Sequence, residues 1–154
     1  MTKESKQQQL VADMADLFNK ISAYNKPIME QALPGLTLSE IEVLELMVTI
    51  EDANVTKLAE RYYMTRGAIS KITKKMQTKE LIETYQYPDN KKEVYFKLTS
   101  KGIAVERKHR RLHEFFYQRD KQVFKHVSEK TVDDMLSFLE TYSTYMDGLK
   151  TRSS

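Results

Sequence analysis

The sequence predicts a mainly α-helical protein with one small β-hairpin, and three observations support this. The chain of 154 residues holds only three prolines and four glycines, so long segments lack a helix breaker. Apolar residues recur at helical spacing along most of the chain. Residues 81–98 differ, because β-branched and aromatic residues there flank the turn sequence Pro88-Asp89-Asn90. The length favours a single domain.

The N-terminal segment predicts one long helix. Residues 6–33 carry apolar side chains at helical spacing. Pro27 either kinks this helix or divides it, and Pro34-Gly35 ends it. The apolar positions are Leu10, Met14, Leu17, Ile21, Ile28 and Ala32.

A second helix is predicted in TLSEIEVLELMVTI, which begins at Thr37. Two pairs at its start have the spacing of a capping box. They are Thr37 with Glu40 and Ser39 with Glu42. The side chains expected to face inward are Ile41, Leu44 and Val48.

Two helices joined by a tight turn predict a helix-turn-helix in the middle of the chain. Asn54 can cap the first of them, VTKLAERYY. Thr65 can cap the second, which runs to about Lys79. The side chains expected to face inward are Val55, Leu58 and Ala59 in the first helix and Ala68, Ile69, Ile72 and Met76 in the second.

A β-hairpin is predicted directly after this pair of helices. Residues 81–87 and 93–98 form its two strands, joined by a polar turn. Val94, Phe96 and Leu98 alternate with polar residues or tyrosine, so we expect them to share one buried face. A hairpin in this position forms the wing of a winged helix-turn-helix.

Two further helices complete the prediction. Thr99 starts a helix that meets no proline and extends to about Lys125. Ser128 can cap the last helix, and Gly148 can end it. The apolar stripe of the last helix consists of Val132, Met135, Leu136, Leu139, Tyr142 and Met146.

Positive charge is concentrated in the middle of the chain. The net charge is only +3, but residues 57–111 hold fifteen Lys and Arg against six Asp and Glu. The rest of the chain holds ten basic and sixteen acidic residues. This division indicates a cationic region that meets a polyanion, with an ordinary solvated surface as the alternative interpretation.

The helix after Thr65 has the composition of a helix that enters the major groove of DNA. No acidic residue lies between Arg61 and Lys79. Small residues let the backbone approach the bases, and an arginine near a helix N-terminus reaches base edges. The predicted DNA-contacting residues are Thr65 at the N-cap, Arg66, Gly67 and Ser70 near the bases, Lys71, Lys74 and Lys75 on the phosphates, and Asn90, Lys91 and Lys92 at the hairpin tip. A solvated lysine-rich face is the alternative.

The sequence contains no motif of an enzyme. It has no cysteine, which excludes disulfides and thiolate metal ligands. It has no glycine-rich phosphate loop, G-x-S-x-G elbow or H-E-x-x-H helix. Its first ten residues lack the apolar core of a secretory signal, and no run of eighteen apolar residues occurs. We therefore expect a non-enzymatic cytoplasmic protein without a membrane partner.

Three blocks of the sequence resemble the MarR family of winged helix-turn-helix transcriptional regulators. They are LTLSEIEVLELM, VTKLAERYYMTRGAISKITKKMQTKELIE and DNKKEVYFKLTSKG. The resemblance implies one domain over residues 1–154, in which residues 36–102 form the winged helix-turn-helix and residues 1–35 and 103–154 form a helical dimerisation region. It further implies a homodimer that binds double-stranded DNA at a pseudo-palindromic operator and represses transcription.

The hairpin tip departs from the family pattern. The wing of the family commonly carries Asp-x-Arg, whose arginine enters the minor groove. This chain has Asn90 and Lys92 at those positions. Lysine keeps the charge of arginine but lacks its planar fork, so the resemblance carries over the sign of the wing contact and does not carry over its specificity.

Many members of the family release DNA when a small, often aromatic, acid binds between the dimer helices and the winged domain. The resemblance therefore implies an effector, whose identity the sequence does not reveal. The candidate ligand-binding residues are Tyr24, Tyr62, Tyr63 and Phe115. For each of them, packing in the core or in an interface is the alternative.

His109 and His113 lie four residues apart on the helix after the hairpin, so their imidazoles share one face. The pair resembles that of the family's zinc-uptake repressors, and Glu42 stands where those repressors supply a ligand from the second helix. Tyr24 replaces their first-helix acid, and the basic neighbours of the histidines would repel a cation. No cofactor is therefore expected. A zinc-responsive repressor is one alternative, and a winged-helix protein-interaction module without DNA binding is the other.

Overall fold

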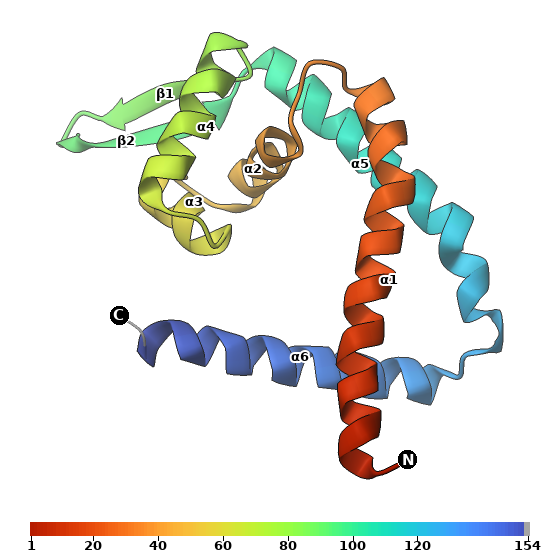
Figure 1. Cartoon of the computed structure of the whole chain (residues 1–154). Helices are drawn as coiled ribbons and strands as arrows, with labels where there is room; N and C mark the ends of the chain where they lie inside the picture. Colours follow the sequence, from red (N-terminus) through yellow and green to blue (C-terminus); the bar gives the residue numbers. More distant parts are fainter. Residues whose placement is uncertain (153–154) are drawn as a thin grey trace. The chain divides into compact units, whose positions relative to one another are not determined.

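A computed structural model describes the backbone of residues 1–152 and the side chains of residues 1–149 (Figure 1). It confirms a mainly helical fold with one antiparallel hairpin. The chain forms two compact units, the first from Met1 to Glu114 and the second from Phe115 onward. Within the described residues, no helix is both long enough and apolar enough to cross a membrane.

The first unit begins with α1 (Lys3–Ala32), which starts at the N-cap Thr2. Pro27 lies inside this helix and does not divide it. The helix ends at Ala32, close to the predicted Pro34-Gly35 stop. Gly35 has a φ of +78°, which only glycine adopts at little cost.

The second helix, α2 (Leu38–Thr49), is capped by Thr37 rather than by Ser39. The Thr37 hydroxyl oxygen accepts a hydrogen bond from the Glu40 amide at 3.1 Å. The prediction that Val48 faces the core was wrong, since its side chain is 51% exposed. The buried face instead turns toward Val43 and Met47, which places Val48 beyond its edge.

The core of this unit lies between α2, α3 (Val55–Arg61), α4 (Arg66–Thr78) and the hairpin (Figure 1). Its fully buried side chains include Leu44, Leu58, Ile69, Met76 and Leu81. These residues come from three helices and the segment before the first strand, so burial of each helix depends on the others.

The wing consists of β1 (Ile82–Tyr87) and β2 (Asn90–Leu98). Ile82 pairs with Leu98, and the register shifts between Tyr85 and Tyr87. The second strand begins at Asn90, three residues earlier than predicted. Val94, predicted to be buried, is 43% exposed because the hairpin extends beyond the core.

The path from the wing into α5 (Ser100–Asp120) is fixed by two contacts. The Thr99 hydroxyl donates to the carbonyl of Glu80 at 2.6 Å and accepts from the amide of Gly102 at 3.1 Å. A Cβ atom on Gly102 would lie 2.0 Å from the carbonyl oxygen of Leu81. Only glycine allows α5 to pass so close to this segment.

The second unit contains the end of α5, a short 3-10 helix η1 (Lys121–His126) and α6 (Glu129–Arg152). Two predictions were wrong here. The helix predicted to reach Lys125 ends at Asp120 and continues as 3-10 turns, which are common at helix ends. Gly148 does not end α6, because a glycine with helical φ costs only about 1 kcal/mol inside a helix. The predicted cap is present, with the Ser128 hydroxyl accepting from the Thr131 amide at 3.1 Å.

Candidate nucleic-acid interface

The turn between α3 and α4 sets the direction of α4. Tyr63 in this turn has a φ of +54°, and the amide of Met64 donates to the carbonyl of Ala59 at 3.1 Å. The Thr65 hydroxyl then accepts from the amide of Ala68 at 3.1 Å, which confirms Thr65 as the N-cap. The left-handed Tyr63 and the cap two residues later turn the chain from α3 into α4.

The inner face of α4 is firmly packed. Ile69 and Met76 are fully buried, and Ala68 and Ile72 are half-buried against the core. The Thr73 hydroxyl, also buried, donates within the helix to the carbonyl of Ile69 at 3.0 Å. This packing fixes which side of α4 faces solvent.

The predicted DNA-contacting residues of this segment lie at the N-terminus of α4, as Thr65 and Arg66 do, or on its outer face. Thr65, Arg66, Gly67, Lys71, Lys74 and Lys75 are exposed, and Ser70 is half-buried. A Cβ atom on Gly67 would meet no other atom within 4 Å, so packing does not require glycine there. In the described part of the chain, Arg66, Lys71, Lys74 and Lys75 form no ion pair with an acid. The face thus presents a positive charge that its surroundings do not neutralise.

Lys79, the next lysine after Lys75, has a different environment. Its ammonium donates to both carboxylate oxygens of Glu40, at 2.8 and 2.9 Å, and to the carbonyl of Gly35 at 2.8 Å. All three of its N–H donors are therefore used within the protein. Lys79 fixes the end of α4 instead of contributing to the exposed cationic face.

The predicted wing residues Asn90, Lys91 and Lys92 lie at the start of β2, directly after the turn, and are exposed. The side-chain oxygen of Asn90 accepts from the amide of Lys92 at 3.2 Å, so Asn90 shapes the tip. The side-chain amide of Gln86 donates to the carbonyl of Lys91 at 2.8 Å. These contacts hold the backbone of the tip and leave both lysine side chains exposed.

Three of the four aromatic residues predicted to bind an effector are largely exposed. Tyr24 and Tyr63 are 75% and 68% exposed, and Phe115 is 54% exposed and belongs to the second unit. Tyr62 lines a cavity of about 260 Å³ in the first unit. The four-residue crevice stays a prediction, although the turn that precedes α4 directs neighbouring Tyr62 and Tyr63 to different environments. The other residues that line this cavity are Met29, Leu38, Glu42, Glu45, Leu46, Arg61, His109 and His113.

The two histidines meet at the same cavity. The Nε2 atoms of His109 and His113 are 2.9 Å apart. Burial lowers the pKa of His109 below its usual value, and the charge of His113 acts in the same direction. One ligand atom from each histidine and a carboxylate oxygen of Glu45 all lie within 4.8 Å of one another. The geometry therefore brings Glu45, which the sequence analysis did not single out, to the histidine pair.

Glu42, the carboxylate predicted to join the histidines, has another partner. It accepts a hydrogen bond from the hydroxyl of Tyr62. Burial and this hydrogen bond raise the pKa of Tyr62 to about 12. Glu42 and Glu45 lie three residues apart and face the same side of α2, so only the packing of α2 against α5 decides which of them approaches the imidazoles.

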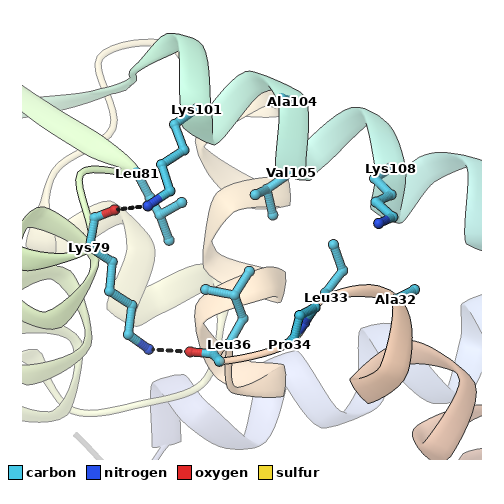
Figure 2. A pocket seen from close by; sticks show the side chains of 11 residues that line it. Ala32, Leu33, Pro34, Leu36, Lys79, Leu81, Lys101, Ala104, Val105 and Lys108 are labelled. Carbon is cyan, nitrogen blue, oxygen red and sulfur yellow. Dashed lines mark hydrogen bonds between the residues drawn. The ribbon is translucent and has the colours of Figure 1, made fainter.

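A larger cavity, of about 420 Å³, lies between the α1–α2 connection, the end of α4 and α5 (Figure 2). Leu33, Leu81 and Val105 supply part of its apolar wall. Three lysines also line it, but Lys79 is held by Glu40 and Gly35, and Lys101 donates to the carbonyl of Lys79 at 2.9 Å. None of the predicted effector-binding residues lines this cavity.

Comparisons with known proteins agree with this architecture. Residues 36–94 match the sequence model of the MarR family. An uncharacterised HTH-type transcriptional regulator of Bacillus subtilis, YhjH, is 34% identical over 105 residues, which span 68% of this chain and 58% of that protein. The HTH-type transcriptional regulator PchR of the same organism is 31% identical over 114 residues, which span 74% of this chain and 68% of that protein.

The fold also matches a solved structure over nearly its whole length. Streptococcus pneumoniae FabT in complex with DNA aligns with a TM-score of 0.80 and 17% identity. The alignment covers 93% of this chain and 99% of that chain. At this identity the similarity concerns the fold alone.

Proposed function

Because the chain belongs to the MarR family, we propose that it is a sequence-specific regulator of transcription that binds double-stranded DNA. The observation that carries the proposal is the outer face of α4. There, Arg66, Lys71, Lys74 and Lys75 are exposed around the small residues Gly67 and Ser70, and none of them pairs with an acid among residues 1–149. Nothing in this arrangement calls for an enzymatic activity.

In this proposal α4 lies in the major groove, which is wide enough for one helix. Gly67 and Ser70 let the helix backbone come close to the base edges. Arg66, at the first position of α4, reaches a base, since recognition helices contact bases through their N-terminal residues. The three lysines bind phosphates, which supply affinity independent of sequence. Lys91 and Lys92 of the wing contact the adjacent backbone or minor groove.

We infer that the protein acts as a homodimer. Apolar side chains on α1 and α6 are exposed in the single chain, and they include Leu17, Phe18, Leu136, Leu139 and Met146. Exposed apolar surface costs about 25 cal/mol per Å² relative to buried surface. A second copy of the chain that covers these stripes would also present two α4 helices to a pseudo-palindromic operator. Sedimentation at micromolar concentration should give a dimer, and a Leu17→Glu/Phe18→Glu variant should shift it toward monomer.

As a regulator bound over a promoter in the cytoplasm, the protein would repress by excluding the polymerase. A small-molecule effector that binds the cavity beside Tyr62 would change the affinity for DNA. This cavity is the site we propose for the effector because it is bounded by α1, α2, α3 and α5, so a ligand there would contact both the long helices and the helix-turn-helix.

The proposal is tested by selecting genomic fragments with the purified protein and measuring the affinity for a selected fragment at several salt concentrations. We expect nanomolar binding that weakens steeply as salt rises. Failure to bind any genomic fragment at low salt would favour the protein-interaction module instead. The genes beside the selected fragments would narrow the search for the effector.

A zinc-responsive regulator is a second candidate, supported by the proximity of Glu45, His109 and His113. A carboxylate and two imidazoles suit Zn²⁺, which would leave one tetrahedral position for water. Arg61 lines the same cavity and opposes a cation, so the fit is partial. Calorimetry with zinc should show binding at low micromolar affinity that a His109→Ala/His113→Ala variant loses. Absence of binding by the unmodified protein would end this candidate.

A further inference from the structure

Three tyrosines form a cluster on one face of the wing. The ring centroids of Tyr85, Tyr87 and Tyr95 lie 5.4 to 5.8 Å from one another. Tyr85 and Tyr95 are directly paired across the two strands, whereas the neighbouring pair, Thr84 and Phe96, turns Phe96 into the core. Because side chains alternate along a strand, the tyrosine cluster lies on the face of the hairpin away from the core.

Asp52, in the connection between α2 and α3, binds two of these tyrosines. Its Oδ1 atom accepts hydrogen bonds from the hydroxyls of Tyr85 at 2.6 Å and Tyr87 at 2.7 Å. The two hydrogen bonds lower the pKa of Asp52, and the same bonds raise the pKa values of both tyrosines. The carboxylate is thus ionised and bonded to two successive outward-facing residues of β1.

The connection that carries Asp52 is itself fixed to the helix-turn-helix. The Lys57 ammonium, at the start of α3, donates to the carbonyls of Glu51 at 3.1 Å and Asp52 at 3.2 Å. Asn54 caps α3 by accepting from the Lys57 amide at 2.8 Å, and its side-chain amide donates to Glu93 of β2 at 3.3 Å. One short connection therefore joins α3 to both strands of the wing.

The wing needs such an attachment. A two-stranded hairpin is marginally stable alone, and this one extends beyond the core, where Val94, Lys91 and Lys92 are exposed. The main-chain link between the hairpin and the connection is the hydrogen bond from the amide of Phe96 to the carbonyl of Ala53, at 2.8 Å, near the base of the wing. The hydroxyl of Tyr87, three residues before the tip, is the attachment of β1 nearest to Lys91 and Lys92.

We propose that Asp52 is a positioning residue for DNA binding. Its carboxylate holds the wing, through Tyr85 and Tyr87, at a fixed orientation to α4, so that Lys91 and Lys92 meet the DNA backbone when α4 enters the major groove. The inference rests on the proposed DNA-binding function and adds a residue that does not itself touch DNA. We name this set of contacts, Asp52 with Tyr85 and Tyr87, the wing latch.

For the change in DNA affinity when Asp52 is neutralised, the wing latch predicts the opposite sign to that expected from charge alone. Asp52 is an acid in a protein that binds a polyanion, so removal of its charge should strengthen binding by Coulomb's law alone. If Asp52 positions the wing, its neutralisation should weaken binding, because the freed wing must be ordered again when DNA binds. The sign of the change therefore separates the two roles.

The experiment uses the full chain and one genomic fragment selected by the unmodified protein. Asp52→Asn keeps the size of the side chain and tolerates the left-handed backbone at this position, where φ is +49°. Glu51→Gln is the matched control, since it removes the same charge one residue away. Tyr85→Phe/Tyr87→Phe removes both donors of the wing latch without a change in charge. Affinity for the fragment is measured at several salt concentrations, with hydrogen exchange of the β1 and β2 amides measured in the absence of DNA.

We expect Tyr85→Phe/Tyr87→Phe to weaken binding about tenfold and Asp52→Asn about threefold, since an asparagine oxygen still accepts neutral hydrogen bonds. Glu51→Gln should bind as tightly as the unmodified protein or more tightly. In the Tyr85→Phe/Tyr87→Phe background, Asp52→Asn should strengthen binding, because no latch is left to break. Loss of a wing contact should also lower the salt dependence by about one unit for each lysine released.

Two results would overturn the proposal. One is an Asp52→Asn protein that binds the fragment as tightly as the Glu51→Gln protein does. The other is unchanged exchange of the β1 and β2 amides in both latch variants, which shows an unaltered wing even if DNA binding is not measurable. Absence of binding by the unmodified protein would instead contradict the proposed function. If Asp52→Asn does not fold, the Tyr85→Phe/Tyr87→Phe variant tests the proposal alone, through its affinity for DNA and the hydrogen exchange of its β1 and β2 amides.

Discussion

The ammonium of Lys79 lies 2.8 Å from the carboxylate Oε2 of Glu40, whose side chain is 2% exposed. The pair joins the end of α4 to the first turn of α2. Lys79 also donates to the carbonyl of Gly35, in the middle of the α1–α2 connection. Three segments that are distant in sequence are thus held together where the helix-turn-helix meets the long helices.

Lys79→Met should destabilise the protein, because it leaves the Glu40 carboxylate buried without a counter-charge. Loss of one partner of a fully buried pair costs about 3–5 kcal/mol, and the partial exposure of Lys79, at 34%, should reduce this to about 1–3 kcal/mol. Urea unfolding measures the change. Lys75→Met, which removes an exposed cation from the same helix, is the control and should change stability by less than about 0.5 kcal/mol. Equal stabilities of the two variants would contradict the role given to the pair.

Gly102→Ala should destabilise the protein by more than about 2 kcal/mol, because the new methyl group would lie 2.0 Å from the carbonyl oxygen of Leu81. Gly148→Ala is the matched control. The Cβ atom there meets nothing within 4 Å, so the variant should gain about 1 kcal/mol of helix propensity. Thermal unfolding compares them, and an unchanged melting temperature for Gly102→Ala would show that α5 can move away from Leu81.

Gly67→Ala should separate the requirements of folding from those of DNA binding. Its Cβ atom would meet no atom of the protein within 4 Å, so stability should rise by up to about 1 kcal/mol. Affinity for a selected fragment should fall, because the methyl group would stand between the backbone of α4 and the base edges. A variant that gains stability and also keeps full affinity would remove Gly67 from the interface.

Glu45→Gln and Glu42→Gln should differ in their effect on zinc binding. Glu45 lies with His109 and His113, whereas Glu42 is hydrogen-bonded to Tyr62. If zinc binds, Glu45→Gln should lower the affinity for zinc about 10- to 100-fold or more. Loss of a residue that supports a metal ligand already lowers metal affinity by about this factor, and loss of a ligand itself should lower it at least as much. Glu42→Gln should have the smaller effect. Calorimetry at constant pH measures both, and the reverse order would restore the ligand set expected from the sequence.

Periodicity predicted the elements of the fold because each helix buries one stripe against the common core. The caps Thr37, Asn54, Thr65 and Ser128 were also predictable, since a cap depends on residues within three positions of it. The end of α5 and the continuation of α6 past Gly148 were not, because both depend on packing and not on a local breaker.

The site was predictable only where it lies on one helix face. The outer face of α4 follows from the positions of Ile69 and Met76. The pairing of Lys79 with Glu40 was not predictable, because the two residues lie 39 positions apart. The role of Asp52 was not predictable from the sequence, because its partner Tyr85 lies 33 positions further along the chain. Contacts between distant segments depend on the assembled fold.

The most direct test of the account compares Arg66→Ala with Lys74→Ala on a selected operator and on its single-base variants. Lys74→Ala should weaken binding to all sequences by a similar factor and lower the salt dependence by about one unit. Arg66→Ala should in addition cost about 1–3 kcal/mol at one base position and remove the preference there. If Arg66→Ala leaves both affinity and base preference unchanged, α4 does not read DNA as proposed.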